Sequence, residues 1–199
     1  RCLWRSFEAL PRLSPRFAPM QVRDYNGTGR WSRNAIIERY AEYAARLSVS
    51  EPVDLSPREH VDGNRRWIYP VMDKVIAGIK SGDAACIAIG AEFMEEDGKF
   101  VFGATLKSQV ARSLRRSELS NAVKTRLRKR IVSMLLAGNT PREYREYIKL
   151  LRKIGFAEYW PKIEAEVPRS NKYALRYFSY LRAVHLKDPS VLRVDLISP

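Results

Sequence analysis

A row of basic side chains with helical spacing is the feature of this sequence that most directly predicts chemistry. Its members recur at intervals of three, four and three residues, and they are Arg142, Arg145, Lys149 and Arg152. Because an α-helix advances about 100° per residue, these positions share one stripe about 80° wide. Guanidinium and ammonium groups in such a row are suited to contacts with phosphate oxygens. The spacing therefore predicts a basic stripe on one helix that can bind a polyanion.

A second basic group precedes this stripe. Nine cationic residues lie between Lys107 and Arg130, against the single acid Glu118. Within the helix expected near residues 120–136, three of them flank one side of the apolar positions, and these three complete our set of candidate nucleic-acid-binding residues: Arg126, Lys129 and Arg130. Two further cations, Lys124 and Arg128, fall on the other side. The alternative interpretation is a solvated helix whose arginine stems cover apolar neighbours.

The composition supports an interaction with a polyanion. The chain has 36 Lys and Arg against 22 Asp and Glu, which gives a net charge of +14. Such a charge attracts nucleic acids, anionic membrane surfaces and acidic proteins, although a basic surface without a specific partner is the simpler alternative. We found no apolar run of the roughly 18–20 residues that a membrane span requires, so we expect no transmembrane segment.

The residues that catalysis or metal binding would need are sparse. The only histidines are His60, expected to be exposed, and His185, expected on the last helix as a partly buried packing residue. No HExxH, CxxC, GxSxG, Walker or dinucleotide motif is present. The weakest alternative is a metal-dependent hydrolase that uses an acidic segment, with the candidate residues Glu92, Glu95, Glu96 and Lys99. We therefore expect a non-enzymatic protein with no catalytic residue, metal or cofactor.

The two cysteines, Cys2 and Cys86, do not indicate a disulfide framework. Cys86 lies between small and apolar residues, where a buried free thiol is the usual state. A reducing compartment fits this pattern, and we expect a cytoplasmic location.

Apolar positions at helical spacing recur along most of the chain and predict an all-α fold. We expect a bundle of seven to eight antiparallel amphipathic helices, at about 32–47, 66–80, 84–97, three between 99 and 154, one starting near 161, and 170–186. Ser32 and Thr140 are the expected N-caps of two of them. We found no convincing strand alternation longer than about five residues. The pattern resembles an irregular HEAT-type or armadillo-type α-repeat, and this architectural resemblance covers at most residues 66–187.

This prediction depends on two apolar helix faces that we expect to be buried. In the segment before Gly138 the apolar positions are Val123, Leu127, Ile131, Met134 and Leu135. In the segment after it they are Tyr144, Tyr147, Ile148, Leu151 and Ile154. The second set spans an arc of about 120° that does not overlap the basic stripe. Binding and packing would thus use different sides of that helix.

Changes in composition suggest four parts. Residues 1–30 are expected to be a flexible Arg- and Pro-rich arm, with a targeting segment and a non-native segment as open alternatives, and residues 31–64 an N-terminal helix with a linker. Residues 65–187 would form the helical core domain and 188–199 a C-terminal tail. We expect that removal of residues 1–29 leaves the thermal midpoint nearly unchanged.

The function that fits these observations is a basic helical domain that binds nucleic acid through its phosphate backbone. A helix-turn-helix within residues 120–154 is a less favoured version, because Tyr144 and Tyr147 are expected in the core. The main alternative is a scaffold for protein interactions, which would use exposed aromatic residues such as Tyr159 and Trp160. DNA, RNA and an acidic protein all stay open as partners, and so does the oligomeric state.

Overall fold

Eight α-helices and a small β-sheet make up the computed structural model, which describes residues 19–98 and 100–187. The helices are α1 (Arg33–Arg46), α2 (Met72–Ser81), α3 (Ala84–Glu95), α4 (Gly103–Leu114), α5 (Asn121–Leu136), α6 (Tyr144–Ile154), α7 (Trp160–Glu166) and α8 (Lys172–His185). Short 3-10 helices span Gly29–Trp31 and Ala157–Tyr159, and the strands are β1 (Gln21–Asp24), β2 (Glu59–Asp62) and β3 (Arg65–Ile68). The all-α prediction is confirmed.

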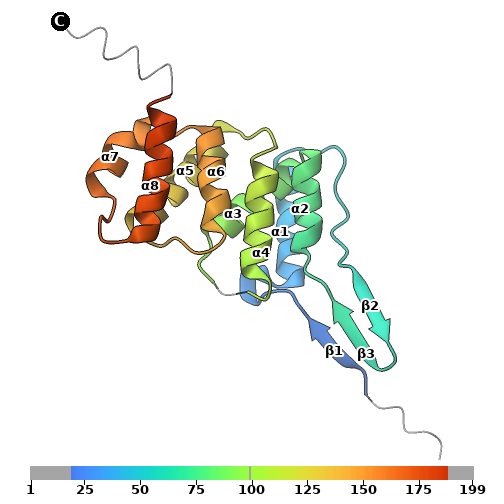
Figure 1. Cartoon of the computed structure of the whole chain (residues 1–199). Helices are drawn as coiled ribbons and strands as arrows, with labels where there is room; N and C mark the ends of the chain where they lie inside the picture. Colours follow the sequence, from blue (N-terminus) through green and yellow to red (C-terminus); the bar gives the residue numbers. More distant parts are fainter. Residues whose placement is uncertain (1–18, 99, 188–199) are drawn as a thin grey trace, which may run out of the picture.

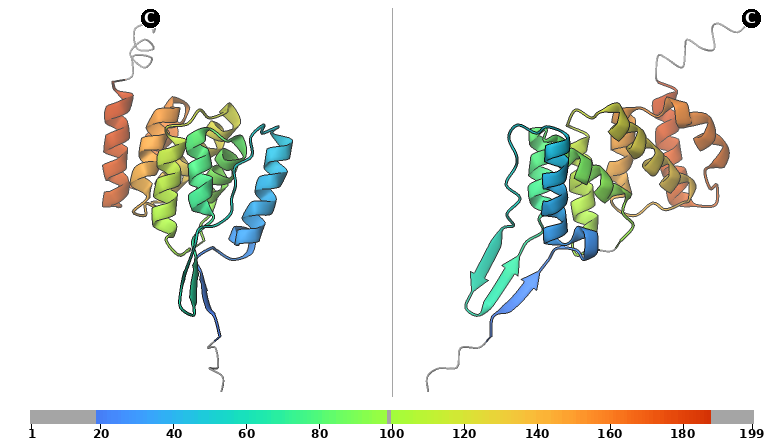
Figure 2. Two further views of the ribbon diagram at one scale, coloured as in Figure 1. Left: turned by 90° about the vertical axis from the view of Figure 1, so that its right-hand side faces the viewer. Right: turned by 180° about the vertical axis from the view of Figure 1, so that it is seen from behind.

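The helices alternate between two layers. In one layer α1 contacts α3, α3 contacts α5, and α5 contacts α7. In the other layer α2 contacts α4, α4 contacts α6, and α6 contacts α8. Figure 1 shows α4, α6 and α8 in front of α3 and α5, and Figure 2 shows the same layers from the side and from behind. Consecutive helices of opposite layers also pack together, as α2 does on α3 and α5 on α6. The specific assignment to a HEAT-type or armadillo-type repeat stays a prediction.

Local sequence explains most helix ends. The side chain of Ser32 caps α1, accepting a hydrogen bond from the N–H of Ala35 at 3.4 Å, as predicted. Asp83 caps α3 in the same way, and Gly82 ends α2 in the left-handed conformation that glycine adopts without strain. The predicted cap at Thr140 is wrong, because α6 begins at Tyr144 after a turn in which the N–H of Tyr144 donates to Pro141 O.

The predicted apolar faces form the centre of the core. Leu127, Ile131 and Leu135 of α5 are fully buried, and so is Tyr144 of α6. The hydroxyl of Tyr144 donates to the backbone carbonyl of Ile131 at 2.7 Å, which satisfies the one polar group of a buried ring. This contact joins α5 to α6 across the two layers.

The structure contains a small sheet that we did not expect from the sequence. β3 lies in the middle of the sheet, parallel to β1 and antiparallel to β2. Consequently the helix expected from residue 66 begins only at Met72, after Pro70, which cannot donate a backbone hydrogen bond within a helix. Strands of four residues carry too little alternation to be recognised, and the partner of β3 lies more than forty residues away in the sequence.

The end of the expected arm is attached to the body. The N–H of Tyr25 donates to Ile68 O at 2.9 Å, the N–H of Val71 donates to the Asn26 side chain at 2.8 Å, and Trp31 is buried in the core. Further along the chain, α1 packs on α3, and the β2–β3 hairpin spans residue 64. The expected division at residues 30 and 64 stays a prediction. The expectations for residues 1–18 and 188–199 fall outside the described residues.

None of the helices in the described part of the chain combines the length and the apolar character that a membrane crossing needs.

Candidate polyanion-binding surface

The basic stripe lies on α6 and on the turn before it. Arg142, Arg145 and Arg152 are exposed, and Lys149 is half-buried with 38% of its side chain accessible. The apolar face of α6 packs against α4, α5 and α8, so that only a strip of the helix surface is left for these cations.

Two members of the stripe, Lys149 and Arg152, meet Lys153 of the same helix and Arg115, which directly follows α4, in a hollow of about 600 Å³ between α4, α6 and α8. We call this hollow the basic concavity, and the residues that line it are Arg115, Lys149, Arg152, Lys153 and Tyr180. No carboxylate is among them. Arg152 donates from Nη1 to the Tyr180 hydroxyl at 3.2 Å, which holds the guanidinium at the rim on the α8 side.

A single acid adjoins the basic concavity and orders it. Glu146 accepts hydrogen bonds from Arg115 at 3.1 Å and from Lys149 at 3.2 Å. Burial opposes ionisation of Glu146, but the hydrogen bond from Lys149 and the charges of Lys149, Arg115 and Arg112 outweigh it, so the pKa of this carboxyl lies below its ordinary value. The carboxylate stays ionised and fixes two of the four lining cations, and an excess of positive charge is left in the hollow.

A neighbouring cation has a structural role that the sequence did not show. Arg128 of α5 donates from Nε to the carbonyls of Gly155 at 2.9 Å and Ile154 at 3.2 Å, and it contacts Glu158 at 3.5 Å. These carbonyls lie at the end of α6, where the helix has no backbone partners of its own. Arg128 therefore closes the helix that carries the stripe.

The candidate residues of α5 do not join the basic concavity. Arg126 forms an ion pair with Glu95 of α3 at 2.6 Å, and Arg130 pairs with Asp97 just after α3. Lys129 is exposed and has no ion-pair partner among the residues described. Arg126 and Arg130 therefore pair with acids at the end of α3 and do not line the basic concavity. Nucleic-acid binding by the seven candidate residues stays a prediction.

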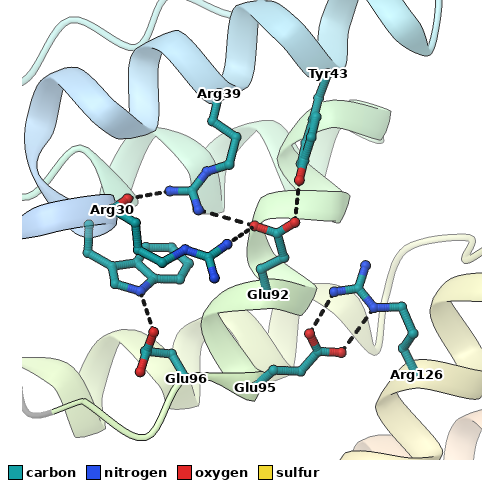
Figure 3. Close-up of polar contacts among 8 residues, drawn as sticks. Arg30, Arg39, Tyr43, Glu92, Glu95, Glu96 and Arg126 are labelled. Carbon is teal, nitrogen blue, oxygen red and sulfur yellow. Dashed lines mark hydrogen bonds and ion pairs between the residues drawn. The ribbon is translucent and has the colours of Figure 1, made fainter.

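The acidic end of α3 is engaged in several separate interactions, which Figure 3 shows together. The carboxylate of Glu92 forms ion pairs with Arg30 at 2.9 Å and with Arg39 at 3.2 Å, and it accepts a hydrogen bond from the Tyr43 hydroxyl. Glu96 accepts from the Trp31 indole at 2.9 Å. The three glutamates that we considered for a hydrolase thus point to different donors.

This arrangement does not fit a cation site. Within residues 19–98 and 100–187 no group of three His, Cys, Asp or Glu side chains is placed to hold a metal ion. Lys99, the fourth residue of that alternative, falls outside the described residues.

The histidines and Trp160, which we considered in the sequence, make ring contacts in the structure. His185 stacks on Trp160 with ring centroids 4.5 Å apart, and His60 is exposed on β2 beside Trp67. Trp160 is buried against Phe178, so the expectation that it could serve as an exposed contact for a protein partner is wrong.

Sequence reasoning missed three residues of the basic concavity. Arg115 and Lys153 each stand next to another cation in the sequence, at Arg116 and Arg152, and this local density is a signal that could have pointed to them. Tyr180 carried no signal, since its place beside Arg152 depends on how α8 packs on α6. No protein-family model, curated protein or solved structure matches this chain.

Proposed function

We propose that this protein binds nucleic acid through its phosphate backbone at the basic concavity and that it catalyses no reaction. One observation carries the proposal: three cations of α6 and Arg115, directly after α4, converge on a hollow that no carboxylate of the described residues lines. A net charge of +14 over the whole chain adds a long-range attraction for any polyanion.

The residue types favour phosphate over other anions. Arg115 and Arg152 present planar guanidinium groups, which can make paired hydrogen bonds to phosphate oxygens. Lys149 and Lys153 add compact charges that follow a chain of phosphates without fixed geometry. Such contacts position a nucleic acid but carry little sequence information, so we expect weak dependence on base sequence.

The helix-turn-helix version has less support. Tyr144 and Tyr147 are buried, and α6 contacts helices on both sides. A recognition helix must instead present its N-terminal part to the major groove. A backbone binder with a cytoplasmic location, as the sequence suggested, is the form of the proposal that we retain.

Charge reversal at two exposed lining residues tests the proposal. Arg152→Glu/Lys153→Glu changes two cations that have no carboxylate partner among the described residues, so the fold should be preserved. The matched control is Lys129→Glu/Lys162→Glu, which makes the same charge change on exposed residues of α5 and α7.

The readout is the affinity for a short labelled DNA duplex, measured by fluorescence anisotropy over a range of salt concentrations. We expect the test variant to bind more weakly for every sequence, with a salt dependence shallower by about two units if two phosphate contacts are lost. Equal weakening in the control would show that only the total charge matters. A parent protein that prefers polyglutamate to the duplex would instead support an acidic protein partner.

A further inference from the structure

A second surface with chemistry of its own lies on the small sheet. In the register of the strands, Trp67 of β3 stands between Arg23 of β1 and His60 of β2. Residues in register on neighbouring strands project to the same face of a sheet, so these three side chains form one row. The rings of His60 and Trp67 lie 5.3 Å apart at an angle of 31°.

Residues just beyond the strand ends, two positions from Arg23, His60 and Trp67, form a second row, and the hydrogen bonds from Tyr25 N–H to Ile68 O and from Tyr69 N–H to Arg58 O continue the pairing there. Tyr69 and Tyr25 have ring centroids 6.3 Å apart, and the guanidinium of Arg58 lies 4.3 Å from the centre of the Tyr69 ring. Two residues of a strand span about 7 Å, so the rows are close neighbours on the same face. Phe102, which is 54% exposed, extends the second row with its ring 5.5 Å from that of Tyr25. We call the two rows the aromatic face.

The aromatic face is accessible and basic. The sheet projects from one end of the helical body, as both Figure 1 and Figure 2 show. Arg23, Arg58 and His60 are exposed, whereas Trp67 and Tyr69 are half-buried, with part of each ring accessible. Arg65 adds a further exposed cation, and the acid on this face is Asp62, which lies opposite Arg65 in the register.

Alternation along the strands places a second set of residues on the other face of the sheet. Val22, Arg66 and Val61 share a register position there, and Glu59 forms an ion pair with Arg66 at 2.5 Å. Trp67 and the two strand arginines that have no ion-pair partner among the described residues, Arg23 and Arg65, therefore lie on the opposite side from this pair.

We propose that the aromatic face binds single-stranded nucleic acid. Unpaired bases stack on Trp67 and Tyr69, while Arg23 and Arg58 contact the phosphates on either side of them. Aromatic residues interleaved with cations are the usual surface for single strands, because every base offers a π-face and the backbone follows the positive charge. A duplex keeps its bases stacked inside and cannot use these rings.

This inference goes beyond the basic concavity, since it names an unpaired strand as the ligand and uses residues of a different part of the fold. The two surfaces share only the general class of ligand. Each can therefore fail without the other.

The test compares Trp67→Leu, which keeps an apolar side chain but removes the ring, with Tyr173→Leu, which removes an exposed ring on α8. The probes are labelled oligo-dT and, as a polyanion without bases, inorganic polyphosphate. We expect Trp67→Leu to weaken oligo-dT binding about tenfold, the loss of one stacked base at about 1.4 kcal/mol, and to leave polyphosphate binding within about twofold. Tyr173→Leu should resemble the parent.

A second variant and a fluorescence measurement distinguish loss of base stacking from a disturbed sheet in Trp67→Leu. Arg23→Gln/Arg58→Gln leaves the rings in place and should also weaken oligo-dT binding. The chain has four tryptophans, of which Trp31 and Trp160 are buried and Trp4 lies outside the described residues. Trp67→Leu should therefore lose the part of the oligo-dT-induced quenching of tryptophan fluorescence that Trp67 contributes in the parent. Oligo-dT binding unchanged in both variants would overturn the inference, and so would an equal loss of polyphosphate binding in Trp67→Leu. Failure of the basic concavity would appear separately, as unchanged duplex binding in Arg152→Glu/Lys153→Glu.

Discussion

The guanidinium of Arg126 on α5 makes two hydrogen bonds to the carboxylate of Glu95 at the end of α3, from Nε to Oε1 at 3.0 Å and from Nη2 to Oε2 at 2.6 Å. This paired geometry occupies the side of the guanidinium that would otherwise face a phosphate. It links two neighbouring helices of the same layer. Arg126, which we proposed from the sequence as a nucleic-acid-binding residue, therefore makes its ion pair within the fold.

We therefore expect Arg126→Ala to affect binding little. Both side chains are partly exposed, at 44% and 32%, so the pair should contribute only about 0.2–1 kcal/mol to the free energy of unfolding. Urea denaturation measures this contribution, and anisotropy titration with the DNA duplex measures binding. A loss of affinity as large as that of Arg152→Ala would return α5 to the binding site.

Leu127 tests the core between the layers. Its side chain is fully buried, and Leu127→Ala should lower the free energy of unfolding by about 2–5 kcal/mol through lost burial and the cavity that is left. The exposed neighbour Lys129 provides the control, and Lys129→Ala should stay within about 0.5 kcal/mol of the parent in the same urea experiment. Equal small effects would mean that α5 does not pack as described.

Asn26 tests the attachment of the N-terminal segment. Its side chain accepts a hydrogen bond from the N–H of Val71 at 2.8 Å, at the start of α2, where Val71 is fully buried and provides no side-chain cap. Asn26→Ala leaves this amide without a partner and should cost about 1–3 kcal/mol. The measurement is thermal or urea denaturation, with the exposed Gln21→Ala as the control.

This finding changes our expectation for the removal of residues 1–29. That deletion would take away β1, Asn26 and the hydrogen bond from Tyr25 to Ile68 together. We now expect it to lower the thermal midpoint. An unchanged midpoint would show that β1 and Asn26 contribute nothing to stability.

Tyr40 should give the stability a dependence on alkaline pH. Burial, together with the hydrogen bond that its hydroxyl donates to Asp83 at 2.8 Å, raises the pKa of Tyr40 from 10.0 to about 12. The unfolded chain then loses this proton at lower pH than the folded protein. The stabilisation is complete below about pH 10 and is lost as the pH rises towards about 12.

The comparison of parent and Tyr40→Phe isolates this effect. Urea denaturation at several pH values should show a shallower fall in the free energy of unfolding for the variant over that interval. The variant should also be less stable at neutral pH, because the N–H of Val53 loses the Tyr40 hydroxyl as its acceptor. Identical pH profiles would contradict the role of Tyr40.

The sequence alone determined the helical class and much of the core. Tyr144, Tyr147 and Ile148 repeat with the period of a helix, and burial of an apolar face is the only way to remove them from water. The exposed positions of Arg142 and Arg145 follow from the same period, since they lie outside the buried arc. These properties depend on residues a few positions apart, which is the range over which a single sequence is informative.

Only the tertiary structure decided which charges meet. Arg115 and Arg152 are far apart in the sequence and line one hollow because α4 packs on α6, whereas Arg126 faces Glu95 because α5 packs on α3. The pairing of Trp67 with Arg23 was missed for the same reason, since β1 and β3 lie more than forty residues apart in the sequence. His60, in contrast, comes from the neighbouring strand of a hairpin. A basic side chain looks the same in the sequence whether a carboxylate or solvent lies opposite it. Packing makes that choice, because contacts between elements depend on how their apolar faces fit together in three dimensions.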